Sequence, residues 1–151
     1  MTVRKWKYTD IRRVAEFEEK QMFPDRWTYN QLASSFLSDK FKGFLIETDD
    51  GEIVGTVALN FGLDEADLVN VLVAARIRKT GLGSMLMQTA LDECEKIELK
   101  RLFLEVRESN IPAIKLYEKF GFEKISQRKK YYKDGETAII MCKNFDYGQG
   151  V

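Results

Sequence analysis

The sequence predicts an α/β protein in which about four helices flank one mixed sheet of seven strands. Two observations predict this class. Strand-like apolar segments are interleaved with segments whose apolar residues recur at helical spacing. The 151 residues, of which 44% are hydrophobic, suffice for one sizeable core. We therefore expect a single domain over residues 1–151.

Capping residues and helix breakers predict two helices after a short opening strand over 5–9. The first helix is expected over 10–23, because an aspartate stands at its start and Pro24 follows its end. Thr28 and Gln31 have the spacing of a capping box, which predicts the start of the second helix.

Three strand-like segments come next. The ranges 41–47 and 53–61 are joined by Asp49-Asp50-Gly51, whose composition is typical of a hairpin turn. The third segment, 66–74, is apolar enough that we expect it at the centre of the sheet.

The second half of the chain begins with a helix expected over 82–97, where apolar residues form one face. A strand over 101–106 follows. Its alternation points Leu102 and Leu104 to one face of the sheet and Glu105 to the other.

The last elements are a helix and a hairpin. Ser109 or Asn110 is expected to cap the helix, and Gly121 to end it. The segments 122–131 and 137–142 are expected to pair as a closing hairpin.

The turn Arg78-Lys79-Thr80-Gly81-Leu82-Gly83-Ser84 lies between an expected strand and an expected helix. A helix start presents unpaired backbone N–H groups and the positive end of the helix dipole, and together they attract an anion. The two glycines permit close backbone approach, while Arg78 and Lys79 add positive charge. The turn is therefore a candidate diphosphate site. An ordinary strand–helix connection is the alternative.

Composition excludes several classes of function. The 24 basic and 24 acidic side chains cancel, so no global field favours nucleic acid or a membrane surface as a partner. The absence of histidine excludes Ser-His and Cys-His catalysis and disfavours most transition metals, so we expect no metal. Cys94 and Cys142 are expected in the core. With no apolar run long enough for a membrane span and no secretory leader pattern, we expect a cytoplasmic protein.

With the glycine turn, a strand and an Asn-capped helix in this order, the chain resembles the GNAT superfamily of acyl-CoA-dependent N-acetyltransferases. Within it, the chain is most similar to the RimI-type ribosomal-protein N-terminal alanine acetyltransferases. The resemblance covers nearly the whole chain and is strongest over Leu104-Glu105-Val106-Arg107-Glu108-Ser109-Asn110 and over 113–122. It implies the GNAT fold, acetyl-CoA as co-substrate and no metal.

The resemblance also implies roles for individual residues. The residues implied to hold acetyl-CoA are Val71, Leu72, Val73, Arg78, Lys79, Thr80, Gly81, Leu82, Gly83, Ser84 and Asn110. Glu105 corresponds to the general base, and Tyr117 to the acid that protonates the departing thiolate. The residues implied to clasp a peptide N-terminus are Phe23, Pro24, Tyr131 and Tyr132.

Each chemical assignment has a structural alternative. Glu105 could be a salt-bridged residue on a solvated face, and Tyr117 a core tyrosine. Tyr131 and Tyr132 could simply be residues of the hairpin. Asn110 is a helix cap whichever role it has.

The hypothesis that follows is a protein N-terminal α-amino acetyltransferase, with a peptide or ribosomal-protein N-terminus as acceptor. At pH 7 about a tenth of α-amino groups are neutral, against roughly one lysine in a few thousand, so the α-amine is the easier nucleophile. Two alternatives stay open: a GNAT enzyme that acetylates a small amine such as a polyamine, amino acid or aminoglycoside, and a non-catalytic acyl-CoA sensor. The oligomeric state is not predicted.

Overall fold

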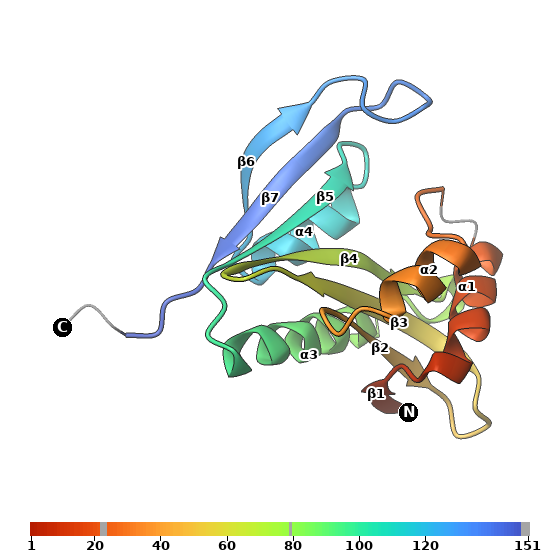
Figure 1. Cartoon of the computed structure of the whole chain (residues 1–151). Coiled ribbons are helices and arrows are strands. Elements are labelled where there is room, and N and C mark those ends of the chain that lie inside the picture. The colour runs from red at the N-terminus through yellow and green to blue at the C-terminus, as the bar shows by residue number, and fades with distance from the viewer. Residues whose placement is uncertain (22–23, 79, 149–151) are drawn as a thin grey trace. The chain divides into compact units, whose positions relative to one another are not determined.

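The computed structural model describes residues 1–21, 24–78 and 80–148 (Figure 1). Phe23 and Lys79, which carry expected roles, lie outside the described residues. Within these ranges the chain forms one seven-stranded sheet in the order β1-β2-β3-β4-β5-β7-β6. The strands are β1 (Thr2–Lys5), β2 (Phe41–Glu47), β3 (Ile53–Phe61), β4 (Glu65–Val73), β5 (Arg101–Arg107), β6 (Glu123–Arg128) and β7 (Ala138–Asn144).

The same described residues contain four α-helices and two short 3-10 helices. They are η1 (Tyr8–Asp10), α1 (Ile11–Lys20), α2 (Tyr29–Phe36), η2 (Ala75–Ile77), α3 (Leu82–Lys96) and α4 (Ile111–Lys119). A mixed sheet with four helices confirms the expected fold class, and β4 occupies the expected central position. In the described part of the chain, no helix is both long and apolar enough to cross a bilayer.

The chain divides into two compact units. The first comprises Met1–Phe61 and Leu68–Glu93, and the second comprises Gly62–Asp67 and Cys94–Val151. The expectation of one domain over residues 1–151 therefore stays a prediction.

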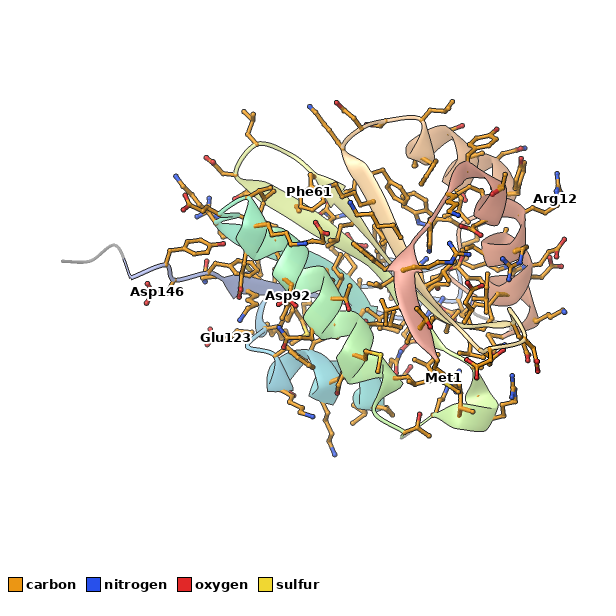
Figure 2. All side chains as sticks on the ribbon, turned by 90° about the horizontal axis from the view of Figure 1, so that it is seen from below. Met1, Arg12, Phe61, Asp92, Glu123 and Asp146 are labelled. Carbon is orange, nitrogen blue, oxygen red and sulfur yellow. The ribbon has the colours of Figure 1, made fainter. Side chains whose placement is uncertain are left out.

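The first unit is built on antiparallel pairing of β1 with β2 and of β2 with β3. The helix α3 packs on β3 where Gly55 leaves room, since a Cβ at that position would lie 3.1 Å from Leu86. Phe61, labelled in Figure 2, ends β3, and its N–H donates to the carbonyl of Lys40 at 2.7 Å. The Asp49-Asp50-Gly51 turn is confirmed, because Gly51 has a φ of +83° and the Thr48 N–H bonds to the Glu52 carbonyl.

The second unit contains the C-terminal strands, and Figure 1 shows β7 between β5 and β6. Both pairings of β7 are antiparallel, while Glu65–Asp67 of β4 pair in parallel with Arg101–Phe103 of β5. In β5 the side chains alternate as expected: Leu102 and Leu104 are buried and Glu105 is exposed. Cys94 and Cys142 are buried, which confirms them as core residues.

Three expected boundaries are wrong. The first strand covers 2–5 instead of 5–9, because Asp10 accepts the Lys7 N–H at 2.7 Å and closes the turn of η1. The first helix ends at Lys20 instead of residue 23. The strand β6 ends at Arg128 instead of Tyr131, and Lys130 then adopts a left-handed φ of +53°.

Candidate active site

The candidate cofactor segment Val71–Val73 forms the last residues of β4, in the first unit. Directly before it, Asn70 adopts a left-handed φ of +48°, which is uncommon for a residue with a side chain. The segment lies beyond the ladder that Glu65–Asp67 form with β5. The Ala74 N–H, directly after it, donates to the Val54 carbonyl of β3 at 2.9 Å.

The glycine turn follows η2 and leads directly into α3. Arg78 Nε donates to the Val73 carbonyl at 3.2 Å, and Thr80 Oγ1 donates to the Ile77 carbonyl at 2.6 Å. Gly81 has a φ of +88°, and a Cβ there would meet nothing within 4 Å. Its carbonyl accepts the Met85 N–H at 3.0 Å, which makes Gly81 the N-terminal cap of α3.

The backbone of this turn fits a diphosphate. The N–H groups of Leu82, Gly83 and Ser84 belong to the first turn of α3, where a helix has no internal acceptors for them. Open space at Gly81 leaves the approach clear of side chains. The expected strand–turn–helix is therefore present, although Lys79 lies outside the described residues.

Glu105 lies on β5, in the second unit, with its side chain 40% exposed. Arg128 of β6 pairs with it, with Nη1 4.0 Å from Glu105 Oε1. A carboxylate that is so exposed and so loosely paired is accessible to a bound amine. The same geometry also fits the alternative of a salt-bridged surface residue.

Tyr117 has the opposite environment. Its residue is 7% exposed on α4, and its ring meets the edge of Phe122 at a centroid distance of 5.9 Å. Burial, with a smaller contribution from Tyr132, raises the pKa of the Tyr117 phenol above its ordinary value. The hydroxyl therefore keeps its proton at neutral pH, as an acid must. The core-tyrosine alternative fits the same burial.

Asn110 is confirmed as the cap of α4, and Pro112 lies in the first turn. Asn110 Oδ1 accepts the Ala113 N–H at 3.3 Å. Because this bond uses only the amide oxygen, the exposed residue retains its Nδ2 donors for a ligand.

The two candidate acceptor tyrosines lie in the loop between β6 and β7, with ring centroids 5.2 Å apart. Arg107, two residues after Glu105, holds this loop: its Nη1 bonds to Asp134 at 2.7 Å and to Glu136 at 2.9 Å. The Arg107 guanidinium also lies 4.1 Å from the centroid of the Tyr132 ring.

Glu136 ties the loop to the start of α4 by accepting the Ser109 N–H at 2.8 Å. Hydrogen bonding with Ser109, followed in importance by the bond from Arg107, lowers the pKa of Glu136. The Arg128 guanidinium adds a further contact. It lies 5.3 Å from the centroid of the Tyr131 ring, while the Arg107 guanidinium lies 4.1 Å from the centroid of the Tyr132 ring. The tyrosine loop, which joins β6 to β7 and carries Tyr131 and Tyr132, is therefore held by charged side chains beside the strand that carries Glu105.

Of the other candidate acceptor residues, Pro24 is exposed in the first unit and Phe23 lies outside the described residues. The neighbouring Trp27 stacks on Phe41 with a centroid distance of 5.8 Å.

Sequence reasoning missed several residues beside the candidate segments. Glu18 of α1 is buried with Asn70 as a polar group that acts on it, and Arg107 organises the tyrosine loop. A signal for Glu18 was present, since it follows the buried Ile11 and Val14 by seven and four residues and so shares their helix face. Among the residues that the structure describes, no group of three or more Cys, Asp or Glu side chains could hold a metal ion.

Comparison with known proteins extends these observations. Residues 6–122 match the Acetyltransferase (GNAT) family. A [ribosomal protein bS18]-alanine N-acetyltransferase of Escherichia coli K12 is 35% identical over 145 residues, covering 93% of this chain and 95% of that protein. An N-alpha-acetyltransferase of Sulfurisphaera tokodaii is 27% identical over 153 residues, covering 93% and 90%.

A solved structure agrees with the sequence matches. The crystal structure of the ribosomal-protein-S18-alanine N-acetyltransferase from Escherichia coli has a TM-score of 0.88 at 32% identity, covering 99% of this chain and 97% of that one. The family match and the similarity to these relatives both extend over most of the chain. The chain therefore belongs to the GNAT family of acetyltransferases, enzymes that use acetyl-CoA to acetylate amines.

Proposed function

We propose that this enzyme transfers the acetyl group of acetyl-CoA directly to the α-amino group at a protein N-terminus, with a ribosomal protein as the acceptor. The observation that carries the proposal is the tyrosine loop held by Arg107, two residues from the exposed Glu105. The names of the bacterial and archaeal relatives support the same acceptor class. A ribosomal acceptor also favours a cytoplasmic location.

The first unit supplies the residues that would hold acetyl-CoA. Backbone groups of Val71–Val73 would pair with the pantetheine arm, as an added strand pairs with a sheet edge. Backbone N–H groups of residues 80–84 would bind the diphosphate, with Arg78 and Lys79 adding positive charge. When bound, acetyl-CoA supplies an activated thioester carbonyl.

The second unit supplies the proton-transfer groups. Glu105 accepts a proton from the attacking amine, which its exposure permits. Tyr117 holds a proton at its phenolic oxygen, available to the departing sulfur. Asn110 offers amide N–H donors at the start of α4.

The acceptor would be held through its first backbone units by Tyr131 and Tyr132, together with Phe23 and Pro24. An aromatic clasp of this kind leaves little room for a large first side chain, so we expect small first residues such as alanine. An internal lysine is disfavoured twice, because it is almost entirely protonated at neutral pH and lacks a free terminus.

A short peptide with a free alanine N-terminus and one internal lysine tests the proposal. We expect mass spectrometry to find the acetyl group on the α-amine. The control is the same peptide with a blocked N-terminus, and spermidine is offered in a parallel reaction. Acetylation found chiefly on the lysine, or only on spermidine, would contradict the N-terminal acceptor and favour a small-amine enzyme.

A further inference from the structure

Glu18 is a buried carboxyl group that the proposed chemistry does not use. The residue is 2% exposed on α1, and within the described part of the chain its Oε2 atom has no hydrogen-bond partner. Burial of a carboxyl group is costly unless polar contacts offset it, so its presence needs a reason. Asn70 and Arg26 are the polar groups that act on this carboxyl group.

Asn70 connects Glu18 to the candidate cofactor segment. It stands directly before Val71 and holds the left-handed φ of +48° within β4. A non-glycine residue in this region persists only where its surroundings hold it. The contact with Glu18 is such a restraint.

A second side chain of the same helix region contacts the other end of this segment. Gln21, the C-terminal cap of α1, accepts the Ala75 N–H through Oε1 at 3.1 Å. Glu18 and Gln21 are three residues apart, and this spacing places them on one side of the helix. Arg12 lies on a different side of α1, at the outer rim in Figure 2, where it stacks on Tyr29. The interactions of Glu18 with Asn70 and of Gln21 with Ala75 therefore lie on either side of Val71–Val73 in the sequence.

We propose that Glu18 and Gln21 are positioning residues that hold β4 from Asn70 to Ala75 in the conformation that the pantetheine arm of acetyl-CoA requires. Their contacts run to Asn70 and to the Ala75 backbone, so they act through the strand. This inference rests on the proposed function in one respect, the assignment of Val71–Val73 to the pantetheine arm. It makes α1 a determinant of cofactor affinity.

Binding of acetyl-CoA in the absence of any acceptor tests the inference. We expect Glu18→Ala and Gln21→Ala each to raise the acetyl-CoA Kd roughly tenfold, the effect of one lost polar interaction that positions the strand. Glu18→Gln, which retains hydrogen-bonding capacity at the same size, should restore most of the affinity. The matched control is Glu19→Ala, because Glu19 is exposed on the same helix and should leave the Kd unchanged.

Two further readouts separate positioning from a general structural effect. In steady-state kinetics, the KM for acetyl-CoA should rise while kcat at saturating acetyl-CoA stays within about twofold. Hydrogen exchange of the free protein should be faster at the amides of 71–75 in both alanine variants, with the β2–β3 hairpin unaffected. Loss of β2–β3 protection as well would indicate a structural role and overturn the inference.

The outcomes also distinguish this inference from the proposed function. An unchanged acetyl-CoA Kd in folded Gln21→Ala and Glu18→Ala proteins, together with normal exchange at 71–75 in Gln21→Ala, overturns the inference alone. If Glu18→Ala does not fold, Gln21→Ala decides. A wild-type protein that binds no acetyl-CoA overturns both, while acetylation of a small amine instead of a peptide overturns only the proposed acceptor.

Discussion

At the scale of single residues, the two candidate proton-transfer groups lie in opposite environments. Glu105 is exposed and lies 4.0 Å from the Arg128 guanidinium, whereas Tyr117 is buried against Phe122. Exposure leaves the carboxylate accessible to a bound amine, and burial keeps the phenol protonated. These environments match a base and an acid respectively, as proposed for this enzyme.

The role of Glu105 predicts a specific pH signature. Glu105→Gln should lower kcat by roughly 10²–10⁴-fold at neutral pH, with partial recovery at high pH where more of the amine is already neutral. Steady-state kinetics across pH measure this, and Glu108→Gln is the control because Glu108 is exposed nearby. A Glu105→Gln enzyme with the full rate at neutral pH would show that another group takes the proton.

The buried carboxyl group of Glu18 leads us to expect that the stability of the folded protein falls as the pH rises. Burial raises the pKa of Glu18 from 4.5 to about 7, against smaller lowering effects of Arg26 and Asn70. Between these two values the folded protein binds more protons than the unfolded chain, so raising the pH through this window reduces stability by up to roughly 3 kcal/mol.

Urea unfolding at pH 5 and pH 8 measures this effect. The loss of stability on going to the higher pH should shrink in Glu18→Gln, which cannot ionise, and persist in Glu19→Gln. An identical pH dependence in wild type and Glu18→Gln would mean that Glu18 ionises normally in the folded protein.

At the scale of elements, a cluster of four charges joins the start of the chain to the sheet. Arg4 of β1 bonds to Asp10 at 2.8 and 2.9 Å and to Glu47 of β2 at 2.7 Å, while Arg13 of α1 lies 3.3 Å from Asp10. The cluster connects β1, η1, α1 and β2. It explains why the first helix begins where it does, although the Asp10 side chain does not cap it.

This cluster predicts the effect of Asp10→Asn. The bond from Arg4 is the main reason that the pKa of Asp10 falls from 3.8 to about 2. A lowered carboxyl pKa stabilises the fold at pH values above the ordinary pKa of this group, and that stability is lost as the pH falls toward 2. Asp10→Asn should therefore cost about 2 kcal/mol at pH 7 and much less near pH 2.

Denaturant titration checks this prediction, with Asp50→Asn as the control because Asp50 is exposed in a turn. Equal stability of Asp10→Asn and wild type at neutral pH would show that the ion pairs contribute nothing net.

The turn before α3 predicts a separable effect on cofactor binding. Gly81 and Gly51 have φ values of +88° and +83°, and at each an added Cβ has open space. Alanine at either position should cost about 1 kcal/mol of stability through backbone strain. Only Gly81→Ala should also weaken acetyl-CoA binding, because its Cβ would occupy the proposed diphosphate cradle.

Calorimetry of acetyl-CoA with the two variants provides the comparison, and Gly51→Ala is the matched control for strain. If both variants bind acetyl-CoA as wild type does, the turn does not hold the diphosphate.

At the scale of the whole molecule, the order of strands and helices follows from local signals that the structure confirms. The Thr28–Gln31 capping box forms with bonds of 2.8 and 3.2 Å, Asn110 caps α4, and Gly121 has a φ of +95° after its end. These features depend on contacts within about four residues, so the types of residue suffice to predict them. The GNAT resemblance, carried by residues 104–122, then indicated the family to which the chain belongs.

Other features depend on contacts between residues far apart in the chain. Arg4 and Glu47 are 43 positions apart, Arg107 and Glu136 are 29 apart, and Gln21 and Ala75 are 54 apart. The placement of the first strand, the support of the tyrosine loop and the bracket around Val71–Val73 rest on these pairs. Local propensity cannot reveal such pairs, because their free energy arises only after the sheet brings distant segments together and excludes water around them. For this reason Glu105 and Tyr117 were recognisable as residue types, whereas the exposure of one and the burial of the other emerged only from the folded protein.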